Sequence, residues 1–375
     1  MQILVIISIV VLLAVIVTAA HGIKRKRTSG PKKNKKEDVE LKRSARNPIL
    51  RPRNDKDWER EATFNPAAIK VGDKTHLLYR AVGGDGVSRI GHAESQDGIN
   101  FNERSDFPVF FMENPRRFHE PAAPHYDPVL NPSGGSWGGA EDPRIVNIDG
   151  TLYMTFNTFD GWDFIRIGLT SIKEKDFKEK KWSWSRTKLI SPANQVNKNW
   201  VLFPEKIDGK FAILHSLSPS VQIDYVDSLD HLSSGAKKIL SRFGQKAPRE
   251  SWDTWVRGAG PPPLKTKDGW LVFYHAINKI DSHRYKLGML LLDLKNPKKI
   301  LARAKAPVLL PDRWYENEGK PGIVYACGAI LEKEKVYVYY GGGDKYVCVA
   351  ISPLQEIMDY LKKVGPEPHF DFKER

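Results

Sequence analysis

The sequence predicts an all-β fold, namely a five-bladed β-propeller that follows an N-terminal transmembrane helix and ends in a short C-terminal helix. The main observation is a repeat: five times, an apolar strand leads into a tight polar turn, a strongly β-forming second strand and, after a variable gap, a third strand. Successive turns lie about 60 to 75 residues apart, which suits a four-stranded propeller blade with its loops. No amphipathic segment of helix length interrupts the repeats.

Each repeat centres on a hairpin whose second strand is rich in β-branched and aromatic residues. These second strands are predicted at 75–80, 151–156, 210–215, 270–275 and 335–340. The turns before them, at 72–73, 149–150, 208–209, 268–269 and 332–334, are hairpin signals. The third strands are predicted at 88–93, 165–170, 221–226, 285–290 and 346–351. Residues 353–364 show helical spacing of their apolar residues and predict the C-terminal helix.

The N-terminus predicts a membrane anchor. Residues 3–20 carry no charge and are long enough to cross a hydrocarbon layer of about 30 Å as a helix. Four basic residues, 24–27, follow directly, so the positive-inside rule predicts a single-pass membrane protein whose body lies in the cytoplasm. Cleavage near Ala20 and export is the alternative. The expected organisation is an anchor or signal segment at 1–23, a basic disordered tether at 24–46 and the propeller at 47–375.

The charge of the chain is concentrated near the N-terminus. Residues 24–53 hold thirteen Lys/Arg against three acidic residues, whereas the whole chain has a net charge of +14. The body therefore carries only a small share of the excess, and we expect no nucleic-acid partner. Cys327 and Cys348 lie in apolar runs and are too few for a disulfide framework, so both are expected as reduced core residues.

The first strand of each repeat should line the central channel of a propeller, so chemistry is expected where these strands begin. The starts at 64–68, 140–144, 202–206, 258–263 and 325–329 combine small residues and prolines with polar groups. In the second of them, Glu141 and Asp142 are adjacent carboxylates followed by Pro143 and Arg144. Because proline cannot donate to a central ladder, Asp142 is expected where its strand begins, and its carboxyl can do proton chemistry.

Several motifs together resemble glycoside hydrolase family 130, the β-mannoside phosphorylases and related β-mannosidases. They lie in order from about Asn47 to Leu361, at 64–68, 78–81, 88–91 with 95–98, 141–144, 200–206, 258–263, 287–288 with 292–293, and 339–344. The resemblance implies a five-bladed propeller and inverting phosphorolysis of a β-mannosidic bond to α-mannose 1-phosphate. It also implies a β-mannoside oligosaccharide or glycan as substrate and inorganic phosphate as co-substrate, with no cofactor and no metal. Assembly into a homo-oligomer is left open.

The resemblance also implies roles for particular residues. Asp142 matches the general acid, thought in this family to deliver its proton through a sugar hydroxyl. Inversion with phosphate as nucleophile needs one acid and no protein base, because phosphate attacks already ionised. The positions that hold the mannosyl unit are matched by Asn65, Arg80, Arg89 and Asp344. Phosphate ligands are expected at Lys206 and Arg166, with His215 and Tyr274, which end second strands, as further candidates.

One departure from the family pattern keeps alternatives open. Phosphorylases of this family commonly have arginine after the position of His215, and this chain has Ser216. An inverting β-mannoside hydrolase is the first alternative; it needs a carboxylate base such as Glu205, Glu250 or Glu318. A non-catalytic carbohydrate-binding propeller is the second.

The segment 110–137 looks longer than is typical of the family and is expected to form a lid or rim on the acceptor side. It contains His119, Glu120, His125 and Asp127, whose side chains are of the types that bind metal ions. Their spacing matches no compact ligand motif, so no metal is predicted there.

Overall fold

The computed structural model describes residues 38–112, 125–131, 133–160, 165–244 and 251–366. Their strands form four sheets, which we divide into five groups of consecutive antiparallel strands, numbered in chain order. Groups 1 and 2 share one sheet, in which a short parallel pairing at Val87 and Ser88 joins them. Group 1 contains β2 (Ala62–Val71), β3 (Lys74–Val82), β4 (Val87–Ser95) and β5 (Glu103–Arg104). Group 2 contains β6 (Gly138–Ile148), β7 (Thr151–Asp160), β8 (Arg166–Lys173) and β9 (Lys188–Leu189). The all-β prediction is thereby confirmed for the described residues.

The remaining groups follow the same plan. Group 3 contains β10 (Val201–Leu202), β11 (Phe211–Ser216) and β12 (Gln222–Val226). Group 4 contains β13 (Trp255–Ala259), β14 (Leu264–Lys265), β15 (Trp270–Asn278), β16 (Asp281–Leu292) and β17 (Ile300–Arg303). Group 5 contains β18 (Val324–Glu332), β19 (Lys335–Gly342) and β20 (Tyr346–Pro353), with β1 (Lys42–Arg43) paired to β20. The helices are the short α2 (Glu174–Lys178) and α3 (Asp230–Ser233), the 3-10 turn Trp314–Glu316, and α4 (Leu354–Val364), which confirms the predicted C-terminal helix.

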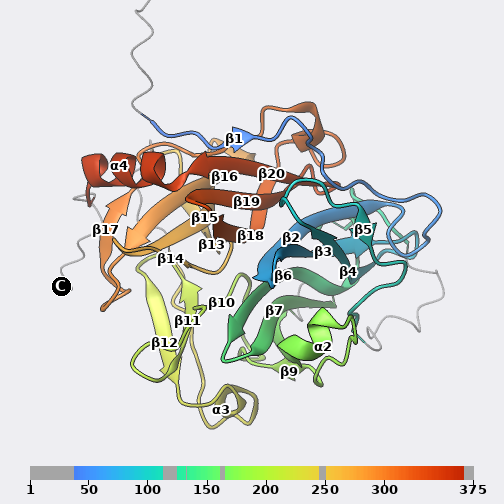
Figure 1. The fold of residues 1–375 in the computed structure, drawn as a ribbon, viewed down its shortest axis with the longest axis horizontal. Helices are drawn as coiled ribbons and strands as arrows, with labels where there is room; N and C mark the ends of the chain where they lie inside the picture. Colours follow the sequence, from blue (N-terminus) through green and yellow to red (C-terminus); the bar gives the residue numbers. More distant parts are fainter. Residues whose placement is uncertain (1–37, 113–124, 132, 161–164, 245–250, 367–375) are drawn as a thin grey trace, which may run out of the picture. The chain divides into compact units, whose positions relative to one another are not determined.

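The groups contact one another in a closed ring (Figure 1). Strand β2 contacts β6 and β18, β6 contacts β10, β11 contacts β13, and β16 contacts β18. Each boundary between neighbouring groups is filled by its own cluster of buried apolar side chains. Examples are Met154 between groups 1 and 2, Trp200 between 2 and 3, Trp270 between 3 and 4, Phe273 between 4 and 5, and Tyr339 between 5 and 1. The arrangement is propeller-like, because both faces of each group are buried against a neighbour.

Four of the five first strands are bulged, the exception being β10. The register shifts between Phe64 and Ala67 in β2, between Glu141 and Arg144 in β6, between Val256 and Gly258 in β13, and between Ala326 and Gly328 in β18. A bulge leaves a residue out of the ladder and re-aims its side chain. Asp142 therefore lies inside β6, not at its beginning as predicted, because the bulge accommodates Pro143 without a lost ladder bond.

The bulges also impose an unusual backbone on two polar residues. Asn65 has a φ of 46° and Asp142 a φ of 50°, in the left-handed region that L-residues rarely adopt. Both precede a proline. Such strain persists where the surrounding structure enforces it, and it clusters at functional sites.

The predicted membrane localisation is contradicted. Within the described ranges, which begin at residue 38, no helix is long and apolar enough to cross a membrane. The predicted anchor at 1–23 lies outside the described residues. We therefore withdraw the prediction of a single-pass membrane protein.

The chain is also built into the body earlier than the expected boundary at Asn47. The compact unit begins at Asp38. Lys42 and Arg43 form β1 against Ile351 and Ala350 of β20, and the side chain of Leu41 is buried. The last part of the expected disordered tether is therefore ordered, because it supplies the outer strand of group 5. The expectation was wrong because a two-residue edge strand carries no apolar periodicity that a sequence pattern could reveal.

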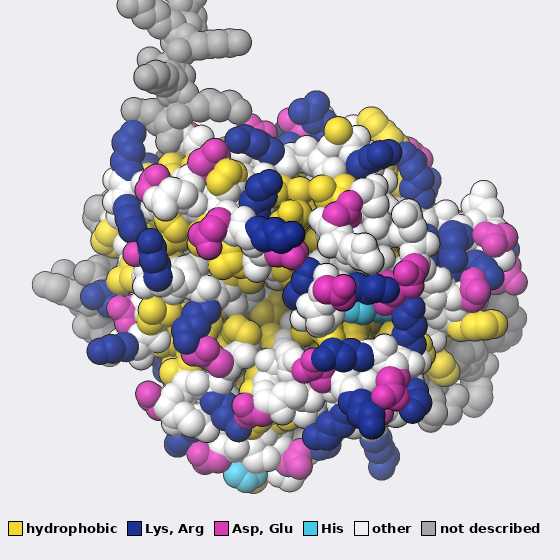
Figure 2. Space-filling view, in the orientation of Figure 1, with side chains coloured by type: hydrophobic (Ala, Val, Ile, Leu, Met, Phe, Trp, Pro, Cys, Tyr) yellow, Lys and Arg dark blue, Asp and Glu magenta, His cyan; other side chains and the backbone are white. Residues whose placement is uncertain are grey.

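Positive and negative side chains are interspersed over the face shown in Figure 2, and no single-sign patch dominates it. Cys327 and Cys348 are both free and buried, as predicted.

Candidate active site

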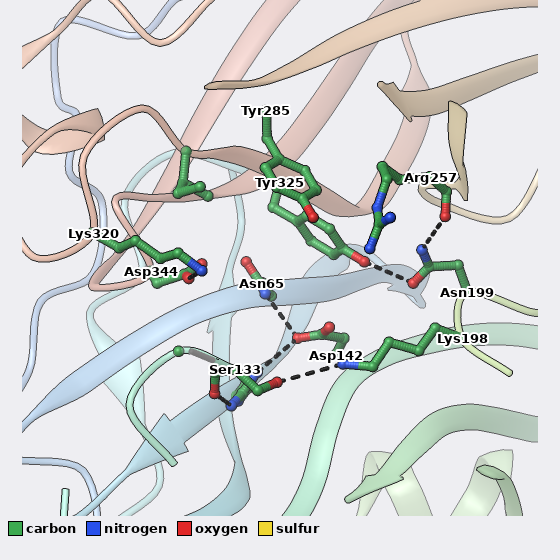
Figure 3. Close-up of a pocket in the computed structure, with 13 residues that line it drawn as sticks. Asn65, Ser133, Asp142, Lys198, Asn199, Arg257, Tyr285, Lys320, Tyr325 and Asp344 are labelled. Atoms are coloured by element: carbon green, nitrogen blue, oxygen red, sulfur yellow. Dashed lines mark hydrogen bonds and ion pairs between the residues drawn. The ribbon is translucent and has the colours of Figure 1, made fainter. Parts of the chain in front are cut away.

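A pocket in the ring brings together side chains from all five strand groups (Figure 3). Strands β2, β3, β6, β13, β16 and β18 contribute side chains, and loops before β6, β10 and β18 and the turn after β19 supply the others. The lining residues are Asn65, Arg80, Ser133, Gly134, Asp142, Lys198, Asn199, Arg257, Tyr285, Lys320, Ile323, Tyr325 and Asp344.

Asp142 lies at the centre of this pocket. Its Oδ1 accepts hydrogen bonds from Asn65 Nδ2 at 2.7 Å and from Arg80 Nη1 at 3.3 Å, and its Oδ2 accepts one from Asn157 Nδ2 at 3.2 Å. Burial by itself would raise the pKa of the Asp142 carboxyl. The charges of Arg80, Arg144 and Lys198 outweigh burial and hold that pKa below its usual value. The carboxyl is therefore ionised at neutral pH.

Arg80 is held in place from several sides. Its side chain is only 3% exposed, and its Nη2 donates to Glu141 Oε1 at 2.8 Å. The rim segment contributes too, because the Ser133 carbonyl and the Ser136 hydroxyl also accept from Arg80. Part of the segment expected to act as a rim thus touches the pocket; residues 113–124 and 132 lie outside the described residues. The fully buried Glu141 is a second carboxylate, besides Asp142, that compensates the guanidinium.

One side of Asp142 offers polar groups suited to sugar hydroxyls. Asn65 lines the pocket, and its buried Oδ1, which lies beside Gly341, has no hydrogen-bond partner among the described residues. Asp344 lies on the same side in Figure 3, next to Lys320, with 3.8 Å between Oδ2 and Nζ. Burial raises the pKa of the Asp344 carboxyl; Asp142 adds to the rise, while Lys320 and Arg80 oppose it. Asp142 and Asp344 thus have pKa values pushed in opposite directions within one pocket.

The other side of Asp142 carries cations (Figure 3). Arg257, on β13, lies over the ring of Trp255 at 4.6 Å from the centroid, and no acidic side chain among the described residues pairs with it. Lys198 reaches Glu141 Oε2 at 3.5 Å. Asn199 lies beside both cations and accepts a hydrogen bond from Tyr325 Oη at 2.7 Å. A guanidinium and an ammonium that face a pocket next to a carboxyl make a site for an anion.

Comparison of the sequence with known proteins identifies the family. The family described as beta-1,4-mannooligosaccharide phosphorylase matches residues 32–363. The chain belongs to glycoside hydrolase family 130. A 1,2-beta-oligomannan phosphorylase of Thermoanaerobacter sp. (strain X514) is 38% identical over 85% of this chain and 99% of its own length. A beta-1,2-mannobiose phosphorylase of the same organism is 36% identical over 84% of this chain and 98% of its own length.

Solved structures support the fold. The beta-1,2-mannobiose phosphorylase from Listeria innocua, in complex with β-1,2-mannobiose, has a TM-score of 0.64 at 23% identity, covering 86% of this chain and 99% of that one. A glycosyl hydrolase from Bacteroides ovatus has a TM-score of 0.65 at 22% identity, covering 85% of this chain and 95% of that one. At these identities the likeness bears on the fold alone.

The structure brings four of the nine predicted family 130 site residues to the pocket and places five elsewhere. Asn65, Arg80, Asp142 and Asp344 line the pocket. The other five are outside its lining and engage nearby groups: Arg89 with Asp85, Arg166 with the Ser191 carbonyl, Lys206 with Asp149, His215 with Asp224 and Ser241, and Tyr274 with Asp253.

Two of these placements have a simple physical reason. Lys206 lies beyond the end of β10 and its Nζ is 2.9 Å from the exposed Asp149 Oδ2, so it is at the far end of the strand from the pocket. Tyr274 and His275 are neighbours on β15, where successive side chains point to opposite faces. Tyr274 packs in the apolar cluster between groups 3 and 4, whereas His275 stacks on the pocket residue Tyr325 with 3.8 Å between ring centroids.

The sequence reasoning missed Lys198, Asn199, Arg257, Tyr285, Lys320 and Tyr325. A signal was present for two of them. Lys198 stands two residues before the family motif at 200–206, and Arg257 stands immediately before the motif at 258–263. Because the beginnings of first strands line the channel, cations on the N-terminal side of those motifs are better placed than Lys206 at the C-terminal side.

A possible metal cluster lies away from the pocket. Ring nitrogens of His76 and His92 and a carboxylate oxygen of Glu94 lie within 4.8 Å of one another. Protein partners account for the cluster: His76 Nδ1 and His92 Nε2 share a hydrogen bond of 3.0 Å, and Glu94 Oε1 is 2.6 Å from Lys74 Nζ and 3.1 Å from Lys180 Nζ. Two ammonium groups beside the carboxylate disfavour a further cation, so we assign no metal to it.

Proposed function

We propose that this protein is an inverting glycoside phosphorylase that cleaves β-mannosides with inorganic phosphate and releases α-mannose 1-phosphate. The observation that carries the proposal is that one pocket contains both a central carboxyl, Asp142, and the guanidinium of Arg257. No acidic side chain among the described residues pairs with Arg257. A phosphate ion needs such cations, and it needs no protein base because it is already ionised. The family assignment supports the same chemistry.

The roles follow from the two sides of the pocket. Asn65, Arg80 and Asp344 hold the mannosyl unit, and Lys198 and Arg257 hold phosphate. A phosphate oxygen attacks C1 of the mannosyl unit on the face opposite the glycosidic bond, so the configuration inverts. The electron pair of the breaking bond goes to the glycosidic oxygen, which takes a proton that originates from Asp142.

Asp142 must be protonated to act as an acid, although its pKa lies below its usual value. The positive charges of Arg80, Arg144 and Lys198 keep its pKa low. A bound phosphate dianion offsets part of this positive charge and adds negative charge close to Asp142. Both changes raise the pKa of the carboxyl, so phosphate binding and protonation of the acid favour each other.

We further propose that the preferred linkage is β-1,2. The two relatives at 38% and 36% identity, which the chain covers almost completely, are named for β-1,2-linked substrates. A beta-1,4-mannooligosaccharide phosphorylase of Ruminococcus albus is only 28% identical. We also interpret the five strand groups as the blades of a five-bladed propeller, closed by the pairing of β1 with β20.

The carboxylates considered as the base of a hydrolase do not favour that alternative. Glu205 is ion-paired with Lys265 at 2.6 Å and Glu318 with Lys345 at 3.0 Å, and neither lines the pocket. Glu250 lies outside the described residues. Retention of Asp142 among these cations also disfavours a purely carbohydrate-binding role. Assembly as a homo-oligomer stays a prediction.

The test is to incubate the purified protein with β-1,2-mannobiose and with β-1,4-mannobiose, each with and without phosphate, and to identify the first product. We expect phosphate-dependent release of α-mannose 1-phosphate, faster from the β-1,2-linked disaccharide. Release of free mannose at the same rate without phosphate would show that the protein is a hydrolase. Faster phosphorolysis of the β-1,4-linked disaccharide would overturn the linkage alone.

A further inference from the structure

We propose that Arg43, in the N-terminal strand β1, is a positioning residue for the mannosyl side of the pocket. It acts through the buried carboxylate of Glu316, which holds the loop 317–323 and thereby Lys320. This inference rests on the proposed function, because it assigns the effect to one of the two substrates.

Arg43 connects the N-terminal strand to the segment before β18. Although it lies on an edge strand, its side chain is only 7% exposed. Its Nε donates to Glu316 Oε1 at 2.7 Å and its Nη2 to Glu316 Oε2 at 3.1 Å, a two-pronged contact that fixes the orientation of both groups. Nη2 also pairs with Asp312 Oδ1 at 2.9 Å and donates to the Leu310 carbonyl.

Glu316 is the centre of this network and is fully buried. Besides Arg43, its carboxylate accepts hydrogen bonds from Tyr340 Oη at 2.8 Å and from the backbone N–H groups of Asp312 and Arg313 at 2.8 and 2.9 Å. Arg43 is the cation that compensates this buried charge, with 2.7 Å between Nε and Oε1. Loss of the guanidinium would therefore drive Glu316 to move toward water or to take up a proton.

The backbone of the same residue holds the pocket loop. The Glu316 carbonyl accepts from the N–H groups of Gly322 and Ile323, both at 3.1 Å, which closes the loop that carries Lys320. Lys320 N–H then donates to the Gly343 carbonyl at 2.8 Å, next to Asp344. A shift of Glu316 is thus transmitted by short, continuous hydrogen bonds to Lys320 and to the turn that bears Asp344.

The loop serves the mannosyl side of the pocket rather than the phosphate side. Lys320 and Asp344 lie together on one side of Asp142, and Arg257 and Lys198 lie on the other (Figure 3). The phosphate-side cations belong to β13 and to the loop before β10, neither of which Arg43 contacts through these bonds. Displacement of the loop should therefore weaken mannoside binding more than phosphate binding.

The experiment compares Arg43→Met with the matched control Lys42→Met. Lys42 is the neighbouring residue of β1 and is also ion-paired, with Glu356 Oε2 of α4 at 3.4 Å, but this pair is exposed and does not involve the pocket loop. For each variant we measure KM for β-1,2-mannobiose at saturating phosphate, KM for phosphate at saturating mannoside, and the melting temperature. We expect Arg43→Met to raise the mannoside KM about tenfold or more, since a shift of about 1 Å remote from the chemistry can cost that much.

The phosphate KM of Arg43→Met should stay within about twofold of the parent, and Lys42→Met should change neither constant. Arg43→Lys, which keeps the charge without the two-pronged contact, should fall between the parent and Arg43→Met. A purely structural role would lower the melting temperature and the amount of active enzyme but leave both KM values at those of the parent. That result would overturn the proposal.

A second variant keeps the proposal testable if Arg43→Met does not fold. The double variant Arg43→Met, Glu316→Gln removes both buried charges and retains an acceptor for Tyr340, and a raised mannoside KM is expected for it too. A folded double variant with the parent's mannoside KM would refute the inference.

Titration calorimetry with β-1,2-mannobiose alone separates a failure of the inference about Arg43 from a failure of the proposed function. A parent that binds the disaccharide without phosphate-dependent turnover overturns only the function, and the dissociation constants of the variants then test Arg43. A parent that does neither overturns both.

Discussion

Replacing Arg257 by methionine should weaken phosphate binding selectively. The guanidinium faces the pocket beside Asp142 and has no acidic partner among the described residues, so its removal leaves no buried carboxylate uncompensated. Methionine keeps most of the apolar stem of Arg257, whereas the contact of the guanidinium with the Trp255 ring is lost. A hydrogen bond to a charged group contributes about 2 kcal/mol, which corresponds to about a 30-fold rise in the phosphate KM. The mannoside KM should change little, because that substrate binds on the other side of Asp142.

The assay is steady-state phosphorolysis of β-1,2-mannobiose with each substrate varied in turn. Lys206→Met is the matched control: it removes a cation that the family motif favoured but that the structure places outside the pocket, 2.9 Å from Asp149. We expect the control to keep the parent's phosphate KM. The reverse pattern, in which Lys206→Met loses phosphate affinity and Arg257→Met keeps it, would refute the assignment of the phosphate side.

Two further predictions concern protonation. Asp142→Asn keeps the shape of the acid and removes its proton, so kcat should fall by about 10² or more while the melting temperature shows a folded protein; an active variant would mean that the proton comes from another group. Burial, followed by the charge of Arg144, lowers the pKa of His275 from 6.5 to about 3. Since its folded pKa lies below its unfolded one, the stability it contributes is complete above pH 6.5 and is lost as pH falls toward 3. Over this window the parent should lose up to about 1.4 kcal/mol per pH unit more than His275→Gln in urea unfolding, and equal slopes would contradict a buried neutral His275.

The fold was predictable because its signals are local. Alternating apolar residues and turn residues recur at each hairpin, and the predicted second strands appear as β3, β7, β11, β15 and β19, displaced by at most a few residues. Family membership was predictable for a similar reason, since the motifs lie in order along the chain. Asp142 was predicted as the acid because Glu-Asp-Pro-Arg sets two carboxylates and an arginine beside an apolar strand and matches a family motif.

The cations of the pocket were not predictable in the same way. Lys206 and Arg166 occupy conspicuous motif positions. However, bulges and the packing between groups decide which end of a strand faces the channel and to which face of the sheet a side chain points. Lys198 and Arg257 come from groups 3 and 4, and only closure of the ring brings them beside Asp142 of group 2.

The sequence by itself therefore determined the all-β repeat and the family, and it singled out Asp142 as the candidate acid, because each of these depends on residues that are neighbours along the chain. Only the tertiary structure decided that residues 38–46 belong to the body, that Arg43 reaches Glu316, and which cations face Asp142. These contacts join residues far apart in sequence, such as Arg43 and Glu316, and form when buried charges must find partners as the ring closes.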